Sequence, residues 1–180
     1  NGLPAVCLPL FMSHILDASD QDQAALLFIY FLFAVIGIPI WVWLSRILAK
    51  HTVWCMSMTL ACVVFLTVPL LSAGDIFAFG LICALTGLAL GSDLTLPPAI
   101  QADCADWDCL RFQKERTGTL FAYWSMSTKL ALGLAVGIAF PVLSWVGLDD
   151  QTQTASIQSK TTLIVIYAII PIVFKSIAIM

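Results

Sequence analysis

Long stretches without charge constrain this chain more than any other feature. Residues 24–44 and 53–71 contain no charged side chain, and residues 76–102, 118–148 and 161–180 contain one each. A helix of about 20 apolar residues spans the hydrocarbon core of a bilayer. The chain therefore predicts an all-α membrane protein with five spans.

The two ends of the chain look incomplete. Residues 1–16 are apolar but shorter than a full span, and the chain starts at Asn1 inside this stretch. The last stretch ends at Met180 with no flanking anchor. We therefore expect residues 1–16 to be part of a sixth span, with the first and last helices truncated.

The composition excludes other protein classes. Of 180 residues, 61% are hydrophobic and 11% are charged, whereas a soluble domain carries about 25% charged residues. The net charge is −3, with no basic run of the kind that binds nucleic acid. The bilayer is the expected solvent, and no nucleic-acid partner is expected.

Positive charge is uneven between the connecting segments. Segments 45–52 and 101–117 contain five Lys and Arg residues, whereas segments 17–23, 72–75 and 149–160 contain one. Short loops rich in Lys and Arg stay on the cytoplasmic side. We expect a multi-pass protein with residues 45–52 and 101–117 in the cytoplasm.

Lys129 is the most informative residue, because a Lys near the centre of a span costs about 2.5 to 3.5 kcal/mol on insertion scales. Counting about 1.5 Å per residue from Thr117 places its backbone about 18 Å deep, beyond the reach of snorkelling. Charges at this depth mark ion or substrate pathways. We assign Lys129 and the nearby Ser125 to such a pathway, and a purely structural Lys with a compensating partner is the alternative.

Asp93 is the second intramembrane charge in this pathway assignment. It lies on the preceding, antiparallel stretch at a neighbouring depth, which allows an ion pair with Lys129. Lys175 lies fourteen residues into the last stretch, where we expect it to snorkel to the cytoplasmic interface. Tyr123 and Trp124 either stack on a sugar ring or, as we expect, pack on neighbouring helices.

Mixed charges gather in segment 101–117. One interpretation is a solvated loop with weak local pairs, and the other is a cytoplasmic gate whose ion pairs change between transport states. The gate candidates are Asp103, Asp106, Asp108, Arg111 and Arg116.

Small-residue spacings predict helix contacts, and catalytic signatures are absent from the sequence. Gly87 with Gly91, and Gly133 with Gly137, have the spacing that lets membrane helices approach closely. No HExxH, GxSxG or P-loop motif occurs, so we expect no enzyme. The acidic segment around Cys104 lacks metal-ligand spacing, and no metal is expected.

Three motifs carry a family resemblance. They are GSDLTLPPAIQADCADWD from Gly91 to Asp108, KERTG from Lys114 to Gly118, and WSMSTKLAL from Trp124 to Leu132. The chain resembles the glycoside-pentoside-hexuronide:cation symporter family, the melibiose-permease-like branch of the major facilitator superfamily. Thr117 stands where that family often has Glu.

The resemblance implies a fold, an activity and several roles. The chain would be the C-terminal six-helix half, residues 1–180, of a twelve-helix transporter in the plasma membrane, which in bacteria is the inner membrane. Lys129 matches the family lysine beside the sodium or proton site, Asp103 and Asp106 match the paired aspartates at the cytoplasmic mouth, and Arg116 matches a basic position there.

The implied activity is cation-coupled sugar or glycoside symport by alternating access, with Na⁺ or H⁺ as coupling ion and no other cofactor. The implied partners are the sugar or glycoside, the bilayer and the N-terminal half of the transporter. In this family the N-terminal half carries the acidic cation ligands. A lipid- or drug-moving relative and a non-transporting membrane scaffold are the alternatives.

Overall fold

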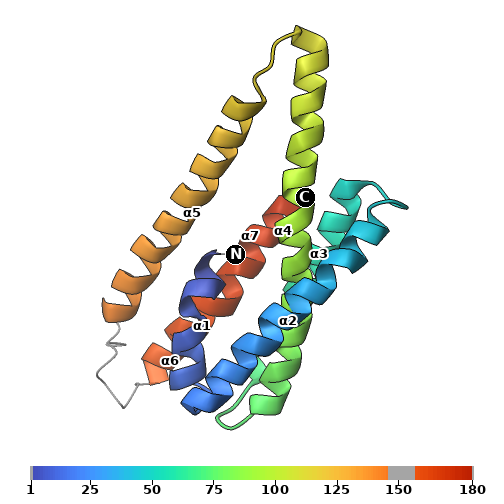
Figure 1. Cartoon of the computed structure of the whole chain (residues 1–180). Coiled ribbons are helices and arrows are strands. Elements are labelled where there is room, and N and C mark those ends of the chain that lie inside the picture. Colours follow the sequence, from blue (N-terminus) through green and yellow to red (C-terminus); the bar gives the residue numbers. More distant parts are fainter. Residues whose placement is uncertain (1, 146–156, 180) are drawn as a thin grey trace.

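The computed structural model describes residues 2–145 and 157–179, and the described residues form helices joined by turns and short irregular connections. The helices, shown in Figure 1, are α1 (Gly2–His14), α2 (Asp20–Leu44), α3 (Lys50–Phe65), the 3₁₀ turn η1 (Val68–Leu70), α4 (Ile76–Phe112), α5 (Thr117–Trp145), α6 (Ile157–Ile164), the π-helix η2 (Val165–Ile169) and α7 (Ile170–Ile179). Within the described residues, five helical segments are long and apolar enough to cross a membrane, and α1 is shorter. The expected all-α membrane fold is confirmed.

Helix α4 is longer than the sequence predicted. The expected span ended near Ala102, but the helix continues to Phe112, so only residues 113–116 connect it to α5. Its 37 residues span about 55 Å at 1.5 Å per residue, well beyond the hydrocarbon thickness of about 30 Å. The segment 101–117 is therefore mostly helix rather than loop, and Figure 1 shows it projecting past the other helices.

Close backbone contact joins α2 to α4. A Cβ atom added at Gly87 would clash with the carbonyl oxygen of Tyr30, and one added at Gly91 would lie 2.6 Å from the carbonyl oxygen of Ala34. Only a residue without a Cβ permits this approach. The predicted contact face at Gly87 and Gly91 is confirmed.

The second predicted glycine face behaves differently. Added Cβ atoms at Gly133 and Gly137 would find no heavy atom within 4 Å among the described residues. Within the described residues no helix packs against these two α5 glycines, and the contact face that they mark stays a prediction.

Polar contacts fix which connections share an end of the bundle. Ser19 caps α2 in a capping box with Asp22, and the backbone N–H of Gly74 donates to the carbonyl of Leu16 at 3.2 Å, so the acidic connections meet at one end. At the other end, Lys50 pairs with Asp103 at 2.6 Å. We call this second end, which carries residues 45–52 and 101–117, the basic end.

Aromatic rings form the core near the last helices. Phe11 stacks on Phe79 with ring centroids 5.3 Å apart and on Tyr167 at 4.6 Å, and Phe65 meets Tyr167 edge-on at 5.7 Å. These rings come from α1, α3, α4 and η2, and all four are buried. Offset and edge-on aromatic pairs stabilise such packing beyond area burial alone. The cluster fixes η2, and with it the start of α7.

Candidate functional site

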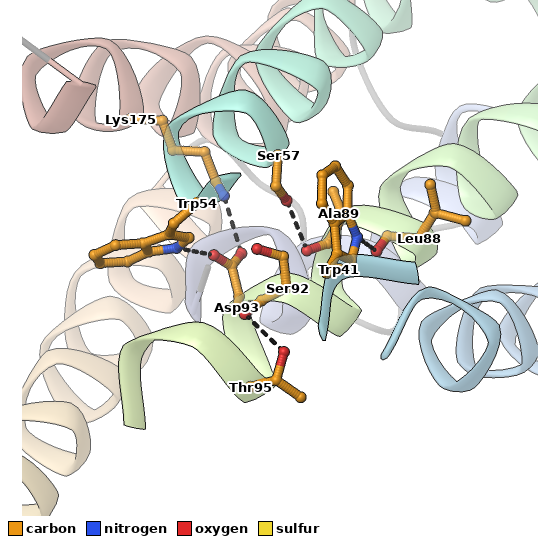
Figure 2. A network of polar contacts seen from close by, with 9 residues as sticks. All are labelled: Trp41, Trp54, Ser57, Leu88, Ala89, Ser92, Asp93, Thr95 and Lys175. Atoms are coloured by element: carbon orange, nitrogen blue, oxygen red, sulfur yellow. Dashed lines mark hydrogen bonds and ion pairs between the residues drawn. The ribbon is translucent and has the colours of Figure 1, made fainter. Parts of the chain in front are cut away.

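A polar cluster lies between α3, α4 and α7, as Figure 2 shows. The indole Nε1 of Trp54 donates to Oδ1 of Asp93 at 2.7 Å, and Nζ of Lys175 donates to Oδ2 at 3.1 Å. The side chains of Lys175 and Asp93 are only 12% and 11% exposed. Asp93 is therefore held by donors from two other helices.

This cluster corrects two expectations. Lys175 was expected to snorkel to the interface, but its ammonium turns inward and pairs with Asp93. Lys129 was considered as the partner of Asp93, yet the described residues show no ion pair between those two side chains. The physical reason is helix placement: α3 packs on α4 and α7 packs on α3, so that Lys175 reaches Asp93, whereas the Lys129 side chain is exposed on α5.

Polar contacts continue along the contact between α3 and α4. The hydroxyl of Ser57 donates to the carbonyl of Ala89 at 3.1 Å, one turn from Asp93, and Lys50 reaches Asp103 at the surface. Lys50, Trp54 and Ser57 follow each other at spacings of four and three residues, which places them on one face of α3. Together with the Trp54–Asp93 bond, these contacts form a row that we call the α3–α4 polar seam: Lys50 to Asp103, Trp54 to Asp93, and Ser57 to the carbonyl of Ala89.

Ser92 is a buried hydroxyl left without a partner. Its side chain is fully buried, and its Oγ has no hydrogen-bond partner among the described residues. A helical Ser usually bonds the carbonyl three or four residues earlier, here Ala89 or Leu88. Those carbonyls already accept from Ser57 and, at 2.8 Å, from the indole of Trp41, besides their own helix bonds. Tertiary donors have therefore displaced the local bond (Figure 2).

Two serine variants test this competition. Ser92→Ala removes an unpaired buried hydroxyl and is expected to leave stability unchanged or raise it by about 1 kcal/mol. Ser57→Ala removes a seam contact and is expected to lower stability by about 1 kcal/mol. Thermal unfolding of the purified, detergent-solubilised variants measures both effects. A Ser92→Ala variant that melts lower than Ser57→Ala would contradict the assignment.

The pathway residues predicted on α5 lie on an exposed surface. Lys129 and Ser125 line an open depression together with Ala122, Met126 and Leu130. Lys129 is exposed and forms no ion pair with the described part of the chain. The structure thus brings Lys129 and Ser125 together and keeps Asp93 apart from them.

The aromatic residues expected to pack do so only in part. Tyr123 is 66% exposed, and Trp124 is half-buried. For Tyr123, the expected packing on neighbouring helices is not seen among the described residues.

The gate candidates divide into paired and unpaired groups. Arg116 makes two hydrogen bonds to Asp108, at 2.8 and 3.2 Å, while the guanidinium of Arg111 lies 4.8 Å from the ring centre of Trp107. The carboxylate of Asp103 forms an ion pair with Lys50. Asp106 is exposed and makes no ion pair within residues 2–145 and 157–179.

The chain matches one family model along almost its whole length. The match is to the MFS/sugar transport protein family over residues 2–180. The chain belongs to this family. A comparison with curated proteins finds no match.

Membership in the MFS/sugar transport family fixes the general activity. The five long apolar helices of the described residues and the match to a family of transporters make the chain an integral, multi-pass membrane protein with a transport role. The resemblance to the major facilitator superfamily is confirmed at this level.

Several polar residues of this MFS member were not anticipated from the sequence. Trp54, Ser57 and Ser92 lie in uncharged or nearly uncharged stretches and look like ordinary membrane residues. The available signal is the spacing of Lys50, Trp54 and Ser57, which marks one helical face. That spacing does not show which residues of another helix the face contacts, so the polar seam could be identified only from the tertiary structure.

Proposed function

We propose that this chain is the C-terminal half of a symporter that couples uptake of a sugar or glycoside to a Na⁺ or H⁺ gradient by alternating access. The observation that carries the proposal is Lys129, a cation in the middle of an apolar helix, exposed beside Ser125 in the α5 depression. A charged amine at this depth requires a polar environment. A water-filled pathway between two halves provides one.

The exposed surface of α5 indicates where the other half belongs. Besides Lys129 and Ser125, which share one side of the helix, polar or aromatic side chains are exposed on its other sides at Tyr123, Ser127 and Thr128. Such a surface is costly in contact with acyl chains. We propose that the N-terminal half covers it and supplies the carboxylates of the cation site, and that Tyr123 and Trp124 contact the substrate.

Uptake by the full-length transporter tests the proposal. The protein is reconstituted in proteoliposomes and given a panel of radiolabelled sugars and glycosides with an inward Na⁺ gradient, an inward proton gradient or no gradient. Gradient-dependent accumulation of a sugar supports the symporter. Accumulation of a lysolipid or a lipophilic drug instead identifies the amphiphile-moving alternative, and no uptake of any of these compounds identifies a scaffold.

Among the three aspartates of the gate candidates, Asp106 is the one that forms no ion pair within the described residues, and this leads to a prediction about the gate. We propose Asp106 as a residue that pairs with the other half in one transport state, because Asp103 and Asp108 are already held within this half. Asp106→Lys is expected to change the maximal transport rate several-fold with little change in substrate affinity, since a gate controls state interconversion.

Initial rates over a range of substrate concentrations measure both quantities. Glu115→Lys is the matched control, because Glu115 is also exposed at the basic end and forms no ion pair with a described residue. It is expected to leave the rate close to wild type. A change in affinity alone in Asp106→Lys would refute the gate.

A further inference from the structure

The side chains of the Trp54–Asp93–Lys175 cluster are better suited to holding a carboxylate in place than to binding a cation. Both oxygens of the Asp93 carboxylate accept N–H donors, one from an indole and one from an ammonium. Hard cations such as Na⁺ require several oxygen ligands. The surroundings of this carboxylate are those of an anion receptor rather than a cation site.

The neighbouring carbonyls supply little free coordination. Leu88 and Ala89 accept from Trp41 and Ser57. One turn later, the hydroxyl of Thr95 donates to the carbonyl of Gly91 at 2.8 Å. Side chains therefore already occupy the carbonyl oxygens on this part of α4, which leaves few ligands for a passing ion.

Charge balance explains why the pair persists in a membrane. A single buried charge is strongly destabilising, whereas a hydrogen-bonded pair of opposite charges is tolerated. Asp93 and Lys175 are each almost fully enclosed, and their charges cancel. The pair also bridges α4 and α7, which are 82 residues apart in sequence at this contact.

The local path of the last span brings Lys175 to this position. The π-helix η2 ends at Ile169, and Pro171 follows in the first turn of α7. Because η2 and α7 are continuous, Pro171 removes an N–H that would otherwise bond the preceding turn, and a π-turn inserts an extra residue that re-aims all later side chains. The break therefore turns the Lys175 face of α7 toward α4.

We propose that Trp54, Asp93 and Lys175 form a neutral intramembrane latch that fastens α7 to the α3–α4 pair and stays outside the path of the coupling ion. The latch keeps these three helices together as one unit. It removes Asp93 from the ion pathway and leaves Lys129 as the intramembrane charge of that pathway in this half.

A double-substitution experiment in the full-length transporter tests the latch. Asp93→Asn and Lys175→Met each leave one buried charge without its partner and are expected to lower the melting temperature by about 10 °C. The double variant D93N/K175M removes both charges and is expected to recover most of that loss. It is also expected to recover cation-coupled uptake.

The double variant D93N/K175M is expected to behave differently if Asp93 belongs to the latch than if it binds the coupling ion. An ion-binding Asp93 would leave the double variant folded but uncoupled, and this result would overturn the latch. A double variant less stable than either single variant would overturn it as well. If the wild-type protein transports no sugar, the proposed function fails, while the melting temperatures still test the latch.

Trp54→Phe gives a second test that does not depend on the charge variants. It keeps an aromatic ring but removes the N–H that reaches Asp93. The latch predicts a lower melting temperature with an unchanged half-saturating cation concentration for uptake. A shift of that concentration would place the cluster in the cation site and refute the latch.

Discussion

Replacing Lys129 by alanine is expected to abolish cation-coupled sugar accumulation by the full-length transporter. Within the described chain, this amine is the exposed cation in the middle of a spanning helix, and it lies beside Ser125 in the α5 depression. Since the other intramembrane charges, Asp93 and Lys175, neutralise each other, alanine at Lys129 would remove the positive charge that remains for the pathway.

The measurement is uptake in proteoliposomes with and without an imposed gradient, at equal amounts of folded protein. Lys114→Ala is the matched control, because it removes the same charge from an exposed connecting segment. It is expected to accumulate substrate at the wild-type level. Full coupled accumulation by Lys129→Ala would contradict the role assigned to the amine and remove the main support for the symporter proposal.

Gly87→Ala is expected to cause a large loss of stability. The new Cβ would overlap the carbonyl oxygen of Tyr30, which is backbone and cannot rotate away as a side chain would. Helix α2 must then shift from α4, which also strains the nearby bond from Trp41 to the Leu88 carbonyl. Overpacking typically costs about 1 to 3 kcal/mol, and we expect at least the upper value here.

Gly80→Ala on the same helix is the control. Its Cβ would meet only Leu26 Cδ2 at 3.6 Å, an ordinary contact with a flexible side chain, and alanine has the higher helix propensity. Melting temperatures of the purified proteins should differ by about 5 to 10 °C between the two variants. Equal melting temperatures would show that the α2–α4 contact is looser than described.

Much of the fold could be predicted because hydropathy is a local property. The uncharged stretches locate the spans, since each residue contributes its own transfer free energy to the bilayer. The motif from Gly91 to Asp108 and its companions indicated the superfamily, which the family match confirms. The end of α4 was misplaced because the charges in 101–112 mark where the chain leaves the bilayer and not where the helix ends, and α4 continues into water as far as Phe112.

The candidate site was predicted less completely. Lys129 and Ser125 were correctly placed together, because three- and four-residue spacing fixes one helical face. Trp54 and Ser92 were missed, because the sequence of an apolar stretch does not show which indole or hydroxyl lies in a polar environment formed by other helices. The gate candidates were found as a set, but their division into paired Asp103 and Asp108 and unpaired Asp106 depended on where Lys50 and Arg116 lie.

The sequence by itself determined that this protein lies in a bilayer, which stretches span it, and that the basic segments gather at one end. Each of these follows from the hydropathy or the charge summed over neighbouring residues. Only the tertiary structure decided that Asp93 pairs with Lys175 and leaves Lys129 on an open face. Depth along a helix can be counted from the chain, but the partner of a buried charge depends on which helices adjoin and how each is rotated. Here the π-turn before Pro171 sets that rotation for α7.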